Sequence, residues 1–222
     1  MTVLNFITSP KAVYIVTDSS FSDPADMRAA GFMTKAYMLP HLEGIIAGTG
    51  LARFVVDWFI QANTQFLVRD MVHLATFAPA QLQSLYRPYH DEFGERARST
   101  IYHWGYDRAS GQMRSYAFRS TSSFAAEELG FGSGLKPATE LDELGIRSFP
   151  DDYIRVMERQ KREDEALPID KRVGIGGHIT AFQLVATDDA AGGTQVLMSA
   201  TRVKELSGFE ADYDAACSKL RI

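Results

Sequence analysis

The chain has 222 residues, of which 45% are hydrophobic and 23% charged, and its formal net charge is -5. Such a chain is long enough to bury a sizeable core, and we expect one domain spanning residues 1–222. The weak negative charge argues against general binding to nucleic acid or to anionic membranes. No stretch reaches the roughly 18 apolar residues of a membrane span, and the first residues lack the features of a signal peptide. We therefore expect a cytoplasmic protein.

Local signals in the first hundred residues predict two hairpins followed by two helices. The expected strands, which are rich in β-branched and aromatic residues, cover residues 3–8, 12–17, 32–39 and 42–47. The polar segment 19–30 is predicted to be a loop. Apolar residues then recur every three or four positions over 51–67, which predicts a helix with Thr49 as its N-cap. A second helix is predicted from about 79 to 96, kinked or split at Pro88.

The rest of the chain is predicted to hold two further hairpins, a β segment and two helices. The expected strands cover residues 100–106, 113–118, 179–187 and 195–203. The additional β segment ends at the glycine-rich stretch 130–134. Helices are predicted over 150–166 and 209–220, and the charge run from Glu158 to Glu165 indicates a solvent-exposed helix face. Strands clustered between helices favour an α+β protein, because a doubly wound parallel sheet would alternate strand and helix.

A possible catalytic site is indicated by three residues near the start of the chain. Thr2 follows Met1, Asp18 ends the second predicted strand, and Lys35 lies in the third. A threonine hydroxyl needs a base to become a nucleophile. An N-terminal threonine carries its own base in the α-amine, whose pKa is about 7.7–8.0. The mechanism therefore requires the removal of Met1, because a chain that keeps Met1 has no free amine on Thr2.

The neighbouring residues supply what this nucleophile lacks. A buried Lys35 ammonium would stabilise the developing alkoxide and lower the pKa of the α-amine, and Asp18 would hold the ammonium in place. Backbone N–H groups at Gly48 or Gly50 could bind the oxyanion of the tetrahedral intermediate. Each residue alone also has an ordinary structural interpretation, because aspartate often forms turns, lysine is common on exposed strands and glycine opens helices.

The order and spacing of these residues resemble a known family. Thr2, Asp18 and Lys35, followed by the Ile-Ile-Ala-Gly stretch that ends at Gly48, resemble proteasome β-type subunits. They resemble especially the bacterial threonine peptidase that works with a separate ATPase ring. Three later segments also resemble stretches of the family, namely Gly105–Asp107, Gly132–Gly134 and Gly176–Gly177. The resemblance extends over roughly residues 2–203.

This resemblance implies a four-layer αββα sandwich of two antiparallel sheets, the fold of the Ntn hydrolases. It also implies threonine-type cleavage of amide bonds in peptides or proteins, and it places Ser133 near the α-amine as a proton relay. The segment that holds Ser19, Ser20 and Ser22 is expected to line the substrate cleft as an edge that pairs with an extended peptide. Family members form rings, so a homo-oligomer is expected by analogy, and an ATPase is a candidate partner.

Two positions depart from the family's pattern. The family places an aspartate and a serine just before the late Gly-Gly, where this chain has Arg172 and Ile175. A non-catalytic proteasome-like subunit with an assembly or binding role is therefore the alternative, and hydrolysis of a small-molecule amide is a second one. The sequence predicts neither a cofactor nor a metal site, because its five histidines lack metal-ligand spacing and its glycine-rich stretches are not phosphate loops.

Overall fold

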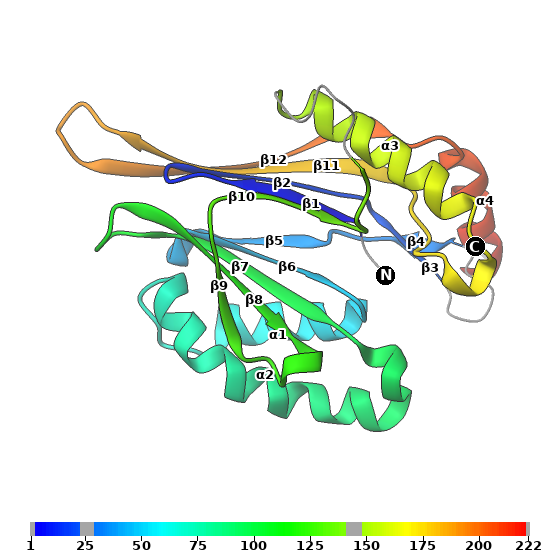
Figure 1. Ribbon diagram of the computed structural model, residues 1–222, viewed down its shortest axis with the longest axis horizontal. Coiled ribbons are helices and arrows are strands. Elements are labelled where there is room, and N and C mark those ends of the chain that lie inside the picture. The colour runs from blue at the N-terminus through cyan, green and yellow to red at the C-terminus, as the bar shows by residue number, and fades with distance from the viewer. Residues whose placement is uncertain (1–2, 23–28, 141–147, 221–222) are drawn as a thin grey trace.

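The computed structural model describes residues 3–22, 29–140 and 148–220 of the chain. Within these ranges the chain forms two five-stranded sheets, a two-stranded ribbon and four α-helices (Figure 1). The strand pairs in all three are antiparallel. The mixed α+β class predicted from the sequence is confirmed. None of the helices in these ranges combines the length and the apolar character that a membrane crossing requires.

The first sheet joins the N-terminal hairpin to the C-terminal hairpin. Its strands lie in the order β10 (Gly132–Lys136), β1 (Leu4–Thr8), β2 (Ala12–Thr17), β11 (His178–Asp188) and β12 (Thr194–Glu205). Helix α3 (Asp151–Glu165) covers this sheet, and the long β11–β12 hairpin projects beyond the shorter strands (Figure 1). Strand β12 is therefore an edge strand of the described sheet.

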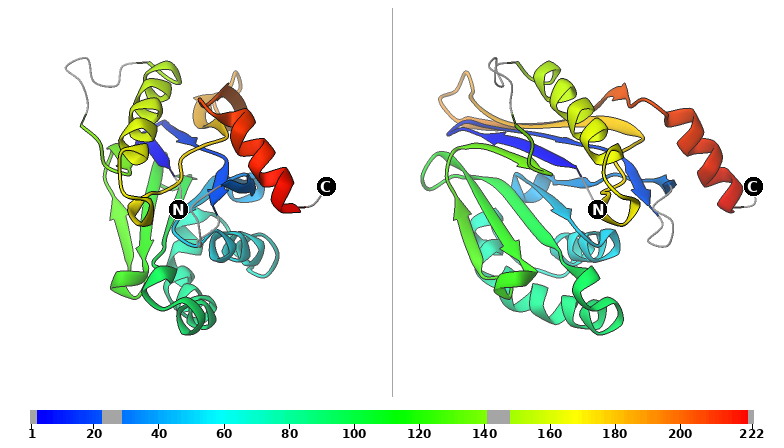
Figure 2. Two further views of the ribbon diagram at one scale, coloured as in Figure 1. Left: turned by 90° about the vertical axis from the view of Figure 1, so that its right-hand side faces the viewer. Right: turned by 45° about the vertical axis from the view of Figure 1, so that its right-hand side comes forward.

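The second sheet is built from the middle of the chain. Its strands lie in the order β5 (Ala36–Leu39), β6 (Gly44–Thr49), β7 (Thr100–Asp107), β8 (Gln112–Arg119) and β9 (Ala126–Leu129). Helices α1 (Ala52–Thr64) and α2 (Met71–Phe93) lie on the side of this sheet that faces away from the first sheet (Figures 1 and 2). The ribbon of β3 (Ser20–Ser22) and β4 (Ala29–Phe32) lies beside helix α4 (Phe209–Leu220) at one end of the molecule (Figure 1).

Buried apolar side chains form three clusters, and the alternation of strand residues explains how one strand serves two of them. Ile45 of β6 packs with Phe6 and Trp104 in a cluster to which both five-stranded sheets contribute. The next residue, Ile46, points to the opposite face and packs with Trp58 and other residues of α1 and α2. The third cluster lies between the first sheet and α3. The sequence thus builds a core on both faces of each sheet.

The start of the first helix differs from the prediction. Thr49 is the last residue of β6 and pairs with Thr100, so it does not cap α1. The backbone N–H of Leu51, at the helix entrance, donates instead to the Ser99 hydroxyl at 3.1 Å. A residue 48 positions further along the chain therefore satisfies this donor, and no local sequence signal predicts it.

Helix α2 is longer than predicted and is not split at Pro88. It begins after Asp70, whose carboxylate accepts a hydrogen bond from the His73 N–H at 2.7 Å. It then continues through Pro79 and Pro88 to Phe93. A proline inside a helix costs about 3 kcal/mol. The buried apolar face that α2 turns toward the second sheet offsets this cost, because tertiary packing supplies most of the stability of a helix in a protein.

Two regions of the chain differ from the prediction in their strands. The segment 19–30, predicted to be a loop, contributes β3 and β4 to the ribbon. The β segment that ends near residue 134 is two strands that belong to different sheets, since β9 pairs with β8 and β10 pairs with β1. Local patterns identify strands but do not say which sheet each strand joins.

Candidate functional site

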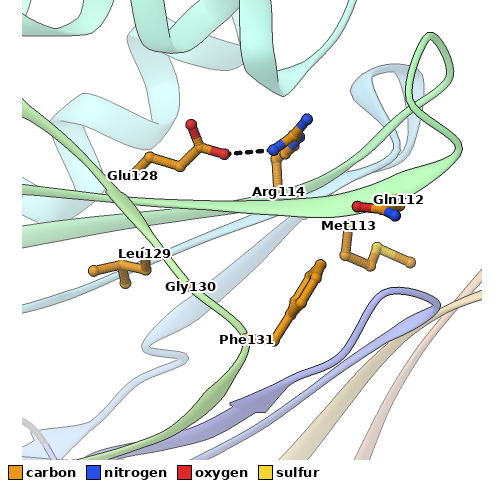
Figure 3. Close-up of a pocket in the computed structure, with 7 residues that line it drawn as sticks. All are labelled: Gln112, Met113, Arg114, Glu128, Leu129, Gly130 and Phe131. Atoms are coloured by element: carbon orange, nitrogen blue, oxygen red, sulfur yellow. Dashed lines mark hydrogen bonds and ion pairs between the residues drawn. The ribbon is translucent and has the colours of Figure 1, made fainter.

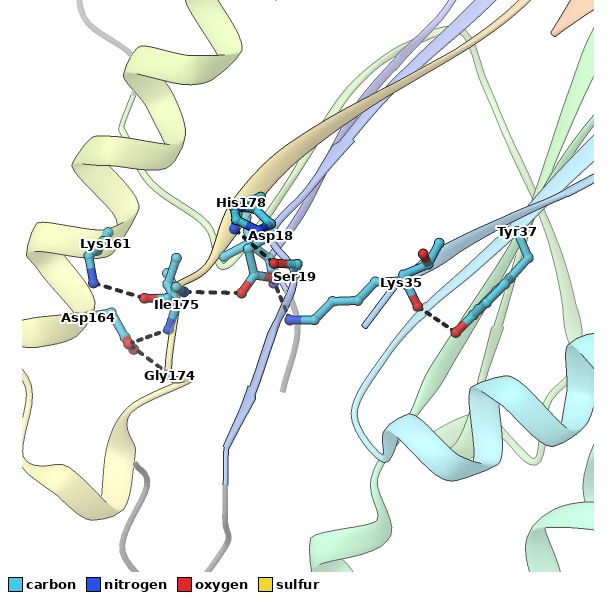
Figure 4. A network of polar contacts seen from close by, with 12 residues as sticks. Asp18, Ser19, Lys35, Tyr37, Lys161, Asp164, Gly174, Ile175 and His178 are labelled. Carbon is cyan, nitrogen blue, oxygen red and sulfur yellow. Dashed lines mark hydrogen bonds and ion pairs between the residues drawn. The ribbon is translucent and has the colours of Figure 1, made fainter. Parts of the chain in front are cut away.

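Asp18 and Lys35 form a buried ion pair that bridges the two five-stranded sheets. The Lys35 Nζ lies 2.6 Å from the Asp18 Oδ1, and the side chains are 4% and 1% exposed (Figure 4). Asp18 directly follows β2 of the first sheet, and Lys35 directly precedes β5 of the second. The end of one strand and the start of another thus bring together two residues that lie 17 positions apart.

Two backbone N–H groups complete the surroundings of the Asp18 carboxylate. The Val3 N–H donates to Oδ1 at 3.1 Å, because the antiparallel pairing of Leu4 with Thr17 places Val3 beside Asp18. The Gly176 N–H donates to Oδ2 at 3.2 Å. Hydrogen bonds to an ionised carboxylate are stronger than those between neutral groups. Asp18 is therefore fixed from the N-terminal strand, from Lys35 and from the segment before β11.

Burial changes the acidity of the lysine in this pair. It lowers the pKa of Lys35 below 10.5, and the charge of Asp18 and its hydrogen bond oppose this change. Lysine is almost never fully buried unless it is paired, because an ammonium loses its hydration in the interior. A buried lysine with a lowered pKa and one carboxylate partner is the type of group found at functional sites.

Thr2, the predicted nucleophile, lies outside the described residues, as does Met1. In the sequence Thr2 is joined to Val3 by one peptide bond, and the nitrogen of that bond is the donor to Asp18. The described part of the site is therefore the ion pair and the first residue after Thr2.

Gly48 lies near the end of β6, close to Lys35. The last pair of β5 with β6 is Ala36 with Ala47, so Lys35 and Gly48 are the residues next to that pair. The Tyr106 N–H donates to the Glu43 carbonyl, so residues 43, 45 and 47 direct their backbone groups to β7. Gly48 therefore directs its N–H toward the side of β6 on which Lys35 lies. Its role as an oxyanion donor stays a prediction.

Gly50 has a clear structural role. Its φ is +103°, and a β-carbon on it would lie 2.2 Å from the Arg98 carbonyl oxygen. Only glycine adopts such a conformation at this close approach without strain. Gly50 therefore lets the chain turn from β6 into α1 against the segment before β7, and its role as an oxyanion donor stays a prediction.

Ser133 lies away from the ion pair. It is exposed and pairs with Ile7, which lies four residues along β1 from Val3, or roughly 13 Å at 3.3 Å per residue. Burial raises the pKa of the Tyr153 phenol to about 12, and the nearby Ser133 side chain lowers it, although the two hydroxyls do not reach hydrogen-bond geometry. The described structure does not bring Ser133 to Lys35.

The serines predicted to line a substrate cleft are largely engaged within the protein. Ser19 and Ser20 are buried. The Ser19 hydroxyl accepts the His178 N–H at 2.8 Å, and the Ser20 N–H donates to the Gly176 carbonyl at 3.1 Å. Because Ser20 also pairs with β4, both sides of this segment are occupied there. Ser22 is half-buried, and it is the one of the three that remains a candidate for contact with a substrate.

The prediction of a solvent-exposed face for the charge run was wrong for two of its residues. Lys161 and Asp164 are buried on the side of α3 that faces the first sheet. They continue a series of buried residues, Tyr153, Met157, Gln160, Lys161 and Asp164, at intervals of one, three and four. This spacing is the signal in the sequence that marks them as members of a buried helix face.

A cavity of about 360 Å³ lies elsewhere, between β8 and the segment that leads from β9 to β10 (Figure 3). Its wall is made of Gln112, Met113, Arg114, Glu128, Leu129, Gly130 and Phe131. None of the predicted site residues lines it. In the part of the chain that the structure describes, no group of three or more His, Cys, Asp and Glu residues could hold a metal ion.

Many solved structures are similar to this chain, including two of Anbu proteins. One is Anbu (ancestral beta-subunit) from Yersinia bercovieri, with 9% sequence identity, a TM-score of 0.57 and alignment over 100% of this chain and 95% of that chain. The other is a mutant of Anbu from Hyphomicrobium sp. strain MC1, with 9% identity, a TM-score of 0.54 and the same two coverages. No family model matches the chain, and no curated protein matches its sequence.

These similarities correct the family resemblance drawn from the sequence. The assignment to proteasome β-type subunits and the ATP-dependent threonine peptidase was wrong, because the structural neighbours are Anbu proteins. Anbu belongs to the same general proteasome-like group, so the part of the resemblance that concerns a proteasome-like fold is supported. At 9% identity the likeness concerns the fold.

Proposed function

We propose that this protein is a threonine-type N-terminal nucleophile hydrolase that cleaves amide bonds, with peptides as the leading substrate class. The observation that carries the proposal is the buried Asp18–Lys35 pair, which shares a hydrogen bond with Val3, the residue after Thr2. A structural role alone is a poor explanation of this pair, because burying two charges costs about as much free energy as their attraction returns.

In this proposal Thr2 acts as nucleophile and base once Met1 has been removed. The α-amine takes the hydroxyl proton as the oxygen attacks the substrate carbonyl, and the Lys35 ammonium stabilises the developing negative charge. The C–N bond then breaks, and the departing amine takes the proton from the α-ammonium. Water, deprotonated by the same amine, hydrolyses the resulting ester and restores Thr2.

We further infer that the molecule is one domain with the four-layer αββα sandwich of Ntn hydrolases. The three core clusters support this arrangement, since one lies between the sheets and one lies under each helical layer. A cytoplasmic homo-oligomer is the assembly we propose with it, by analogy with proteasome-like proteins. The ATPase partner followed only from the resemblance corrected above and is not part of the proposal.

The first experiment measures the intact mass of the purified protein and its activity on a panel of fluorogenic peptides and small amides. We expect a mature chain that starts at Thr2. Thr2→Ala should lose activity at least about a thousandfold, because removing a nucleophile abolishes the covalent route. Thr2→Ser is the matched control, since it keeps a hydroxyl, and Lys35→Met tests the ammonium. Equal activity in the wild type and Thr2→Ala would remove Thr2 from the mechanism.

A non-catalytic proteasome-like subunit is the second candidate, and one observation favours it. Ser133 pairs with Ile7, away from the ion pair. Intact mass separates the two candidates, because a chain that retains Met1 has no free amine on Thr2. Uptake of a threonine-directed covalent inhibitor by the wild type, with none by Thr2→Ala, would exclude the non-catalytic reading.

A further inference from the structure

The buried face of α3 holds the segment that precedes β11. The Asp164 carboxylate accepts three backbone N–H groups in succession, from Val173 at 2.6 Å, Gly174 at 3.0 Å and Ile175 at 3.4 Å. One turn earlier on the helix, the Lys161 Nζ donates to the Ile175 carbonyl at 3.0 Å (Figure 4). The Asp164 carboxylate and the Lys161 ammonium, on one face of α3, thus bind N–H groups and a carbonyl group of this segment.

The fixed segment leads directly to the ion pair. The residue after Ile175 is Gly176, and its N–H donates to the Asp18 Oδ2 at 3.2 Å. Asp18 in turn holds Lys35 at 2.6 Å. From these contacts we propose that Asp164 is a positioning residue of the candidate site, which acts through the segment 173–176 to hold Asp18 against Lys35, with Lys161 in support. This inference deepens the proposed function and rests on it.

The side of the segment that faces away from α3 is also in close contact with the protein. Contacts on both sides therefore determine the position of the segment. A β-carbon on Gly176 would lie 2.7 Å from an Asp212 carboxylate oxygen and 3.3 Å from the Ser20 β-carbon. Gly177 has a φ of +76°, and a β-carbon there would lie 2.3 Å from the Ser19 hydroxyl. Gly177 is therefore required for its positive φ, and a β-carbon at Gly176 would require the Asp212 carboxylate to move, so the backbone comes close to α4 and to the start of the ribbon.

The Asp164 contacts are important because the side chain is buried. Asp164 and Lys161 are 4% and 7% exposed, so neither charge can exchange its protein contacts for water at low cost. Lys161 also pairs with Glu165 at 2.8 Å, at the rim of the same face. Lys161 also interacts electrostatically with Asp212, so it is an ammonium shared by the acidic groups on the α3 and α4 sides of the segment. Asp18, on the other side, has Lys35 as its partner.

The test compares Asp164→Asn with Glu163→Gln, an exposed neighbour on the same helix, and with Asp18→Asn. Asparagine turns an N–H₂ group toward the backbone donors, so the segment should loosen. We expect amide hydrogen exchange at Gly176 to accelerate at least about tenfold in Asp164→Asn while core amides such as Trp104 stay protected. We also expect the pKa of Lys35, followed by NMR of labelled lysine side chains, to fall by about one unit toward its value in Asp18→Asn.

Unchanged exchange at Gly176 and an unchanged pKa of Lys35 in Asp164→Asn would overturn the inference, as would equal changes in Glu163→Gln. If Asp164→Asn does not fold, Lys161→Met decides in the same way, because it removes the support at Ile175 and keeps the apolar stem. Both measurements are made on the folded protein without substrate. An inert Thr2 therefore defeats the proposed function alone, and an active Thr2 with an insensitive Lys35 defeats this inference alone.

Discussion

The acid–base properties of single residues in this protein depend on where the fold buries them. Lys35 and His103 are both buried basic groups, and burial lowers the pKa of each. Lys35 has a carboxylate partner, which opposes that change. Among the described residues, the hydrogen-bond partner of His103 is neutral, because its Nε2 accepts the Trp58 indole N–H at 2.8 Å. The first arrangement keeps an ammonium available for chemistry, and the second keeps an imidazole neutral.

The His103 imidazole should make the protein sensitive to acid. Burial lowers its pKa from 6.5 to about 3, so between these pH values the unfolded chain binds a proton that the folded chain does not. The free energy of unfolding therefore falls as the pH falls through this window, by about 2 kcal/mol at pH 4.5 relative to pH 6.5. Urea unfolding at the two pH values measures this loss.

His103→Gln is the matched variant for this prediction, because it does not titrate and still offers Trp58 an acceptor. We expect its free energy of unfolding to depend much less on pH between 6.5 and 4.5 than that of the wild type. The same pH slope in both proteins would show that other groups cause the acid sensitivity.

At the scale of elements, close contact between a helix and a sheet explains where α2 begins. Its first residue, Met71, is 1% exposed and lies over Gly44 and Gly105, which pair with each other across β6 and β7. A β-carbon at Gly105 would lie 2.4 Å from the Met71 Cγ, and one at Gly44 would lie 2.2 Å from it. Because these two glycines have no side chains, the first residue of α2 can pack directly against the strands.

Gly105→Ala should therefore destabilise the protein through overpacking. We expect a loss of about 1–3 kcal/mol in the free energy of unfolding, the usual cost of an added methyl group in a tight core. In a Met71→Ala background the same substitution should cost less, because the side chain it meets has been removed. A double-mutant cycle measured by chemical denaturation tests this coupling. Equal costs in the two backgrounds would contradict the packing explanation.

At the scale of the whole molecule, local patterns were sufficient for some parts of the fold and not for others. The hairpins β1–β2, β7–β8 and β11–β12 and helix α4 follow from strand composition, turn residues and periodicity. The separation of β9 and β10 into different sheets depends on tertiary pairing, which no local signal contains. The start of α2 has a local signal in its N-cap Asp70, which the prediction did not use, whereas its packing against two glycines of distant strands is not visible in any local pattern.

The sequence likewise predicted some parts of the candidate site and not others. The sequence predicted Asp18, at the end of a strand, as the ion partner of Lys35, and the structure places the two side chains 2.6 Å apart. The proposed position of Ser133 required a register between β10 and β1, and the actual register carries it four residues away from Val3. Asp164 was not recognised as a buried residue, because it lies in a charge run and charged residues are rarely buried. Only its helical spacing from the buried apolar residues of α3 distinguished it.

The exposed edge of β12 has a consequence for how this protein behaves in concentrated solution. From Gln195 to Thr201 the strand carries seven uncharged residues and no proline, whereas edge strands usually carry lysine or proline that prevents pairing with another chain. We expect weak, concentration-dependent self-association visible by light scattering. Leu197→Lys, at a side chain that is 48% exposed, should suppress it, while Ile60→Lys on α1, where the side chain is 47% exposed, should not. Equal suppression by both would mean that added charge, not strand pairing, governs the solubility of the chain.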